Sequence, residues 1–186
     1  MKRQNGFTIT ELLVVMAIVA ILLGIGVPSY RYITNSYRLS AEINSLSGDV
    51  QYARAEAIKQ GQIVIVCASN NSTTCTGTAW NAGWIVFADL NNNGQVDPGG
   101  ATPDVLLHVQ AGFTGTHPDT FALSNAITAI KFNREGFAST TAGFQSTTFT
   151  LADGNTGNKV WQRCLILNPV GMVTVTNHVA DAVNCP

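Results

Sequence analysis

The sequence has few charged side chains and almost no net charge. Charged residues make up 11% of the 186 residues, well below the roughly 25% typical of soluble domains. The formal net charge is -1, so the overall electrostatics give no reason to expect a polyanionic partner. The length suits one compact domain with an appendage. The body is rich in Thr, Asn, Gly and Ala, which favours an exported, β-rich domain with many turns.

The sequence also lacks the short motifs of common active sites. It contains no G-x-S-x-G, P-loop or H-E-x-x-H pattern. Its three histidines, His108, His117 and His178, have no paired nucleophile or carboxylate motif. No His or Cys cluster has the spacing of a zinc site. We therefore expect no enzymatic activity, no cofactor and no such metal site.

One long apolar segment lies near the N-terminus. Residues 7–27 carry a single charge, Glu11, and as a helix they would span roughly 31 Å, close to the hydrocarbon thickness of a bilayer. Eleven of the sixteen residues from Leu12 to Val27 are Leu, Ile or Val, which outweighs the cost of one carboxylate. Lys2 and Arg3 precede the segment and predict a cytoplasmic N-terminus. Most of the chain would then lie outside the cytoplasm.

A cleaved secretory signal peptide is the alternative interpretation of this segment. The apolar run is longer than the usual 7–15 residues or so of a signal peptide. Glu11 lies at its leading edge, and the helical pattern continues beyond Val27. A membrane anchor is therefore the favoured interpretation.

The helix should continue to about Gln60, with Gly61 as its C-cap. Pro28 should kink or locally unwind it. Charged residues such as Asp49 and Arg54 fall largely on the other faces of an apolar stripe, and the second half of the stripe should pack on the globular domain. The stripe consists of Tyr30, Ile33, Tyr37, Ala41, Leu46, Val50, Ala53 and Ala57.

Short β-like runs follow Gly61 and are separated by Gly, Asn, Pro and Ser. A helix followed by consecutive strands predicts an α+β fold, with the helix covering an antiparallel sheet. The candidate strands are 62–68, 83–89, 105–110, 129–133, 147–152, 163–168 and 172–176.

The four cysteines form two local pairs, Cys67 with Cys75 and Cys164 with Cys185. We interpret them as two disulfides, because the N-terminal segment indicates an oxidising compartment. The alternative is four buried free thiols in a reducing compartment, which an export signal disfavours.

The first fifteen residues resemble the class III signal of type IV prepilins and type II secretion pseudopilins. The match consists of Lys2 and Arg3, then Gly6-Phe7, then Glu11 at the start of a membrane span. The resemblance implies that a prepilin peptidase cuts after Gly6 and methylates Phe7, and that Glu11 acts in assembly. Thr10 departs from the family, which usually has an apolar residue there.

The chemistry fits that role. A carboxylate held in lipid is costly unless it has a partner. The α-amine of a neighbouring subunit's Phe7, created by cleavage, would be such a partner for Glu11. Cleavage would then act as a switch for assembly.

The rest of the chain resembles the FimT/GspH group of minor pilins and pseudopilins. The matching segments are residues 51–57, 80–94, 130–133 with Gly136, and 163–167 with Gly171. The resemblance implies the type IV pilin fold, with residues 1–6 as leader, 7–28 as transmembrane and filament-core helix, 29–60 as amphipathic helix and 61–186 as globular domain.

Asp89–Asp97 resembles the first nine positions of a calcium loop, D-x-[DN]-x-[DN]-G. The twelfth position would need a bidentate Glu and is Gly100. Asn-Gly is also a common tight turn. We therefore favour a structural turn over a calcium site.

Some FimT-like pilins bind DNA through a Gly-Arg-x-Arg stretch, and the corresponding place here is Gly171-Met172-Val173-Thr174, where both arginines are missing. Residues 61–186 contain four basic and seven acidic side chains, a formal charge of -3. Phosphate binding needs clustered positive charge, so DNA is not an expected partner.

The sequence thus predicts a minor pilin that acts in initiation or assembly of a type IV pilus. The alternative is the H-type minor pseudopilin of a type II secretion system, and a DNA-uptake receptor is disfavoured. The expected partners are other pilin or pseudopilin subunits, the prepilin peptidase and inner-membrane lipid. The expected location is the bacterial inner membrane, single pass, with the C-terminal domain periplasmic, and then the filament.

Overall fold

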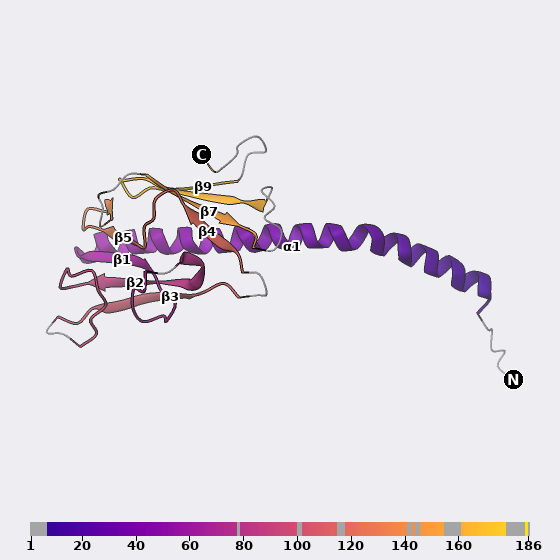
Figure 1. Ribbon diagram of the computed structural model, residues 1–186, viewed down its shortest axis with the longest axis horizontal. Helices are drawn as coiled ribbons and strands as arrows, with labels where there is room; N and C mark the ends of the chain where they lie inside the picture. Colours follow the sequence, from indigo (N-terminus) through magenta and orange to yellow (C-terminus); the bar gives the residue numbers. More distant parts are fainter. Residues whose placement is uncertain are drawn as a thin grey trace. The chain divides into compact units, whose positions relative to one another are not determined.

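The chain builds one long helix followed by a series of short strands. The computed structural model describes residues 7–77, 79–99, 102–114, 118–140, 143, 146–154, 161–177 and 185. Helix α1 extends over Ile9–Gln60, and the chain divides into two compact units, Met1–Arg38 and Leu39–Pro186. The division falls inside α1, so this one helix contributes residues to both units (Figure 1).

Helix α1 stops where the sequence predicts but is not interrupted where it was expected to be. Gly61 follows the helix with a φ of 65°, a left-handed conformation that glycine adopts readily. Of the two predicted effects of Pro28, local unwinding does not occur, because α1 continues through it, and the kink stays a prediction. Proline lacks the N–H that would bond the carbonyl of Gly24, and the helix persists without that one bond.

The buried face of α1 differs from the predicted stripe in its first half, where Tyr30, Ile33, Tyr37 and Ala41 are exposed. The predicted stripe contains a five-residue step between Ala41 and Leu46. This step is longer than the three or four residues that separate neighbours on one helix face, so the residues up to Ala41 were assigned to the wrong face. Helical spacing counted back from Leu46 leads instead to the buried positions 43 and 39. The buried residues are Leu39, Ile43, Leu46, Ser47, Val50, Ala53 and Ala57.

Two antiparallel sheets lie within the unit Leu39–Pro186. Sheet A has the order β3-β2-β1-β5-β6, and sheet B has the order β4-β7-β8-β9. A short 3-10 helix, η1 (Trp80–Ala82), precedes β2. The strands are β1 (Ile63–Ala68), β2 (Gly83–Asp89), β3 (Val105–Ala111), β4 (Thr120–Leu123), β5 (Ala129–Phe132), β6 (Ala138–Ser139), β7 (Thr147–Ala152), β8 (Arg163–Leu167) and β9 (Val173–Asn177).

The structure confirms the α+β class and the antiparallel pairing, and it corrects the expectation of one sheet. Strands β4 and β6 were not predicted. Strand β6 has only two residues, and β4 has four, which gives too little alternation for a pattern to be recognised. Strand β4 pairs with β7, and β6 pairs with β5. The two missed strands are therefore edge strands of two different sheets.

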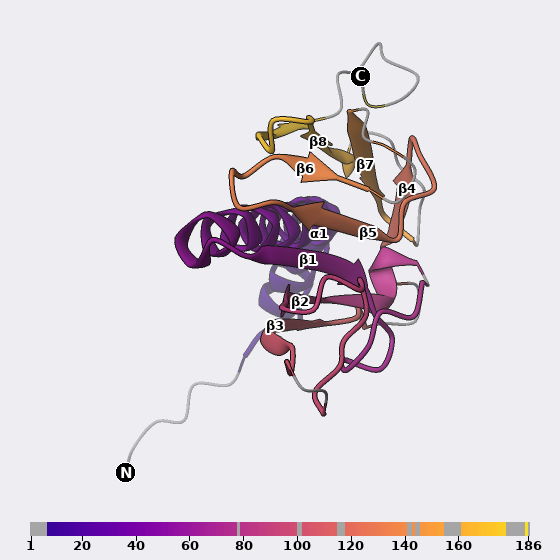
Figure 2. The ribbon, with the colours of Figure 1, turned by 90° about the vertical axis from the view of Figure 1, so that its left-hand side faces the viewer.

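Both sheets pack against the same part of α1, residues 39–57, and share one core with it. Figure 1 shows this part of the helix between β1–β3 and the strands β4, β7 and β9. Aromatic rings join the two sheets at one edge of the core. Trp84 of β2 makes an edge contact with Phe121 of β4, and Phe121 makes another with Phe149 of β7. Figure 2 shows the same unit turned by 90°.

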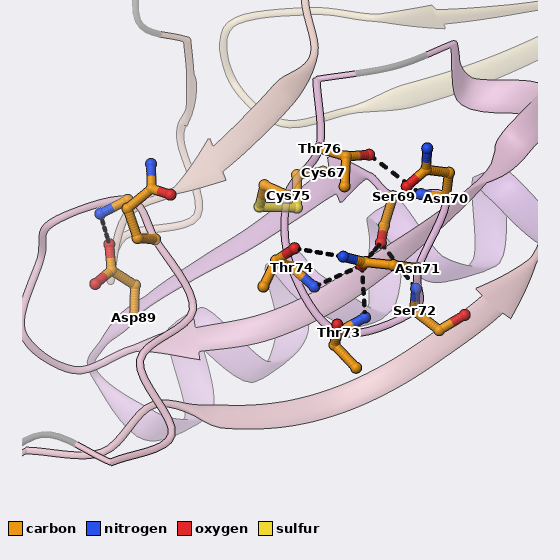
Figure 3. Close-up of a disulfide and its surroundings, with 12 residues drawn as sticks. Cys67, Ser69, Asn70, Asn71, Ser72, Thr73, Thr74, Cys75, Thr76 and Asp89 are labelled. Atoms are coloured by element: carbon orange, nitrogen blue, oxygen red, sulfur yellow. Dashed lines mark hydrogen bonds between the residues drawn. A yellow bond between two sulfur atoms is a disulfide. The ribbon is translucent and has the colours of Figure 1, made fainter.

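The central strands β1 and β2 are buried on both faces. On the face away from α1, Ile65, Ile85 and Phe87 form a second apolar cluster, with Cys75 packed against it. A disulfide joins Cys67 of β1 to Cys75 and closes the loop that covers part of this face (Figure 3).

This disulfide loop is ordered by its own polar side chains. The Asn71 side-chain oxygen accepts hydrogen bonds from the backbone N–H groups of Thr73 and Thr74. The Ser69 hydroxyl oxygen accepts one from the N–H of Ser72. The second predicted disulfide, Cys164–Cys185, is also present, so all four cysteines are paired.

Candidate functional site

The predicted processing segment begins at the start of α1. Gly6 lies outside the described residues, and Phe7 is exposed. Thr8 caps the helix, because its hydroxyl oxygen accepts a hydrogen bond from the backbone N–H of Glu11, 3.3 Å away. Thr10 hydrogen-bonds the Thr8 hydroxyl at 3.2 Å, so this unusual residue belongs to the cap.

Glu11 occupies the third helical position after the Thr8 cap, which gives it a local role besides the predicted one. The pattern Thr-x-x-Glu is that of a capping box, and a carboxylate in the first turn is favoured by the helix dipole. The side chain of Glu11 is exposed. A test of its role in assembly must therefore separate charge from capping.

The apolar segment after Glu11 is exposed along its whole length within the described chain. Its best 18-residue window has a mean hydropathy of 2.7 and no buried residues. Length and composition suit a helix that crosses a membrane. Exposed Leu, Ile and Val in this number need an apolar environment, which lipid or packed helices can supply.

The Asn-rich loop after β2 is held by carboxylates that accept backbone hydrogen bonds. Both oxygens of the buried Asp89 are used, by the N–H groups of Asn93 and Gly94. Asp104 accepts from the N–H groups of Leu90 and Asp97. No group of three or more His, Cys, Asp or Glu side chains suited to a metal occurs among the described residues. The contacts agree with the structural turn; Gly100 lies outside the described residues.

The place corresponding to the DNA-binding stretch is a turn that leads into β9. Gly171 forms the turn, and Met172 and Thr174 are exposed. Arg163 is buried and donates from Nε to the Ser40 hydroxyl, 3.2 Å away. Its guanidinium therefore belongs to the contact between β8 and α1, not to a surface for phosphate.

The remaining bases of the globular part are not gathered into a patch. Lys131 donates to the side-chain oxygen of Asn92. Arg134 pairs with the neighbouring Glu135 at 3.6 Å. Lys159 lies outside the described residues. The described surface of the globular part therefore has no cluster of basic side chains that could replace the missing arginines.

One polar contact between α1 and sheet A was missed from the sequence. Trp84 Nε1 donates to Asp49 Oδ2 at 2.7 Å, and His108 Nε2 lies 3.5 Å from Asp49 Oδ1. Asp49 had been assigned to the outer faces of the helix, and only the register set by Leu39 and Ile43 could have revealed its position. His117 and His178 lie outside the described residues.

The end of α1 carries a pair of side chains with shifted pKa values. Hydrogen bonds from Gln60 and Lys59 hold the pKa of Glu56 below its usual value. The same contact with Glu56 raises the pKa of Lys59. Lys59 is exposed and Glu56 is partly covered, so the pair lies at the surface of the helix end.

Two family descriptions match the chain. The family described as type II transport protein GspH matches residues 42–171. The prokaryotic N-terminal methylation motif matches residues 1–27. The first match covers most of the second unit and the second covers the predicted leader and membrane span.

Curated relatives match over part of their length. A protein named fimbrial protein from Pseudomonas aeruginosa is 30% identical over 95 residues, which is 51% of this chain and 58% of that protein. The pilin-like protein PilA1 of Thermus thermophilus is 32% identical over 96 residues, 52% of this chain and 55% of that protein. The chain thus spans little more than half the length of these relatives.

The fold is found in solved structures. A crystal structure of the type IV minor pilin FimU of Pseudomonas aeruginosa aligns with a TM-score of 0.59 at 19% identity, covering 83% of this chain and 99% of that one. A second crystal form of that protein gives a TM-score of 0.51 at 18% identity. The helix packed on antiparallel sheets is therefore a fold that this chain shares with a minor pilin.

Proposed function

Because the chain belongs to the family described as type II transport protein GspH, we propose that it is a minor pilin of a type IV pilus. It would be a non-catalytic structural subunit that acts in filament initiation or assembly. The observation that carries the proposal is the pairing of an N-terminal methylation motif with the fold of a minor pilin in one chain.

The proposal assigns a role to each part of the N-terminal segment. The peptidase would cut after Gly6 and methylate Phe7, and the segment that follows would hold the subunit in the inner membrane with its globular domain in the periplasm. Glu11 would then pair with the Phe7 amine of a neighbouring subunit during assembly. The exposed apolar helix supports this role, since filament cores and membranes both bury such a surface.

The substitution Glu11→Gln tests the assembly role of the charge. Glutamine also serves at the third position of a capping box, so the variant keeps the cap and loses only the charge. We expect cleavage to proceed, seen as the mass loss of the leader, and filament incorporation to fall at least tenfold by immunoblot of sheared filaments. Glu56→Gln is the control, because it removes a carboxylate from the other end of α1, where Glu56 pairs with Lys59. Normal incorporation of the Glu11→Gln subunit would refute the charge pairing.

A second candidate function is the H-type minor pseudopilin of a type II secretion system, and the GspH family match favours it directly. Deletion of the gene, followed by parallel assays of surface piliation and of exoprotein release, separates the two. We expect piliation to be lost and exoprotein release to continue. The reverse result would make the chain a pseudopilin.

A further inference from the structure

The residues just beyond the apolar segment of α1 bring most of the chain's tyrosines together with a basic side chain. Three of its four tyrosines, Tyr30, Tyr32 and Tyr37, lie within eight residues, and no aromatic residue lies between Phe7 and Tyr30. Tyr30 and Tyr37 are 70% and 74% exposed, and Arg31 is exposed beside them. The core of the globular part therefore does not explain this cluster.

The spacing of the charges along the helix matches the thickness of a bilayer. No charged residue lies between Glu11 and Arg31, and both belong to or border the same exposed helical segment within the unit Met1–Arg38. Twenty helical residues rise about 30 Å, which is the thickness of the hydrocarbon core. When one of these charges is at one interface, the other reaches the opposite interface.

We propose that Tyr30, Arg31 and Tyr32 form an interfacial collar that binds the lipid headgroup layer and sets the depth of α1 in the membrane before assembly. The inference rests on the proposed membrane-held state of the subunit. It assigns the hydrocarbon-spanning residues to 12–29, not 7–28. Glu11 then lies at the opposite, cytoplasmic interface, where water hydrates its carboxylate.

The chemistry of the collar fits lipid better than a neighbouring protein subunit. A tyrosine ring is apolar along its body and polar at its tip, which suits the boundary between acyl chains and headgroups. The Arg31 guanidinium can bind lipid phosphate with two parallel hydrogen bonds. No acidic residue lies between Glu11 and Glu42, so no neighbouring carboxylate in the sequence opposes that attraction.

Nitroxide depth measurements on the full chain test the collar. All four native cysteines are in disulfides, so a single added cysteine gives one labelling site. Labels at Ala17, Ile21 and Ile33 are compared in vesicles of phosphatidylethanolamine and phosphatidylglycerol, using oxygen and a polar nickel complex as collision reagents. We expect Ile21 to be deepest and Ile33 to be in the headgroup layer. A depth maximum at Ala17, with Ile33 in water, would overturn the proposal.

Removing the collar should move the helix. In Tyr30→Leu/Arg31→Leu/Tyr32→Leu we expect the label at Ile33 to sink by about 3–6 Å, which is two to four residues of helix. Tyr30→Trp/Tyr32→Trp should keep the original depth, because tryptophan also prefers the interface. Tyr37→Leu is the matched control and should leave the depth unchanged.

Two other outcomes have distinct meanings. If the triple leucine variant keeps its depth but fails to enter filaments, the tyrosines contact other subunits and the collar is wrong. If every label of the unsubstituted chain is in water, the membrane-held state fails as well, and the proposed function fails with it.

Discussion

At the scale of single residues, two glycines let two tight turns touch each other and α1. A Cβ on Gly171 would lie 2.3 Å from the carbonyl oxygen of Gly136, and a Cβ on Gly136 would lie 2.7 Å from Cδ1 of Ile58. Arg54 Nε donates to that same carbonyl at 3.0 Å. The turn before β6 and the turn before β9 therefore pack closely. Glycine is a steric requirement at position 171, where the near atom is backbone, whereas at position 136 it is favoured by the positive φ of 84°.

Replacing Gly171 by alanine should destabilise the domain strongly. The residue has a φ of 76° and faces backbone on one side, so alanine adds a left-handed strain of about 1–2 kcal/mol and an overlap costing about 1–3 kcal/mol. In a soluble fragment of residues 29–186 we expect a fall in melting temperature of roughly 6–12 °C by circular dichroism.

Two matched glycines separate the causes. Gly94 also has a positive φ but has open space at its Cβ position, and Gly99 has open space without a positive φ. Gly94→Ala should lower the melting temperature by only a few degrees, and Gly99→Ala should leave it within about 2 °C. Equal losses for Gly171→Ala and Gly94→Ala would mean that the close approach to Gly136 has no energetic weight.

At the scale of elements, the disulfide loop after β1 covers an apolar face that the strands cannot bury between themselves. Ile65, Ile85 and Phe87 point away from α1, and a solvent-facing sheet would normally have polar residues there. Cys75 packs against these side chains, and a disulfide, drawn in Figure 3, joins it to Cys67 of β1. Cys75 therefore covers part of this face, together with Val96 of the loop after β2.

Removing that disulfide should lower stability and uncover the apolar face. For Cys67→Ala/Cys75→Ala we expect a loss of about 2–4 kcal/mol in the free energy of unfolding, measured by urea titration. Binding of a hydrophobic dye to the native state should rise. The control Cys164→Ala/Cys185→Ala should lose similar stability without the rise, because its disulfide lies on sheet B. A similar rise in both variants would contradict the covering role.

The same elements show what the sequence can predict. Strand β2 was predicted with its bounds because a run of seven consecutive buried residues begins at Gly83, and such a run is recognisable without alternation. Strands β4 and β6 were missed because two to four residues carry no period. The partner of Asp49 was missed because Trp84 lies 35 residues away, and no local pattern reports such a contact.

At the scale of the whole molecule, several charged side chains of the described globular unit make internal contacts. Arg54 and Arg163 bond groups inside the globular unit, and Asp49, Asp89 and Asp104 accept hydrogen bonds from it. This agrees with a structural subunit and gives a physical reason to expect weak interaction with polyanions.

DNA binding gives the corresponding test. We expect the fragment of residues 29–186 to bind double-stranded DNA more weakly than about 1 μM at 150 mM salt. Met172→Arg/Thr174→Arg places two cations on exposed positions and should tighten binding about tenfold, with a steeper loss of affinity as salt rises. Met172→Gln/Thr174→Gln is the neutral control. Submicromolar binding by the unsubstituted fragment would show that this surface recognises DNA after all.

Both sheets pack on α1, and α1 precedes every strand in the chain, so the helix is synthesised before the strands that cover it. Its buried residues, Leu39 to Ala57, are synthesised before every strand that covers them, and β8 begins about a hundred residues after α1 ends. At roughly 5–20 residues per second, that interval lasts about 5–20 s. During those seconds sheet B is incomplete, so the part of the stripe that sheet B buries needs a temporary cover in a newborn subunit.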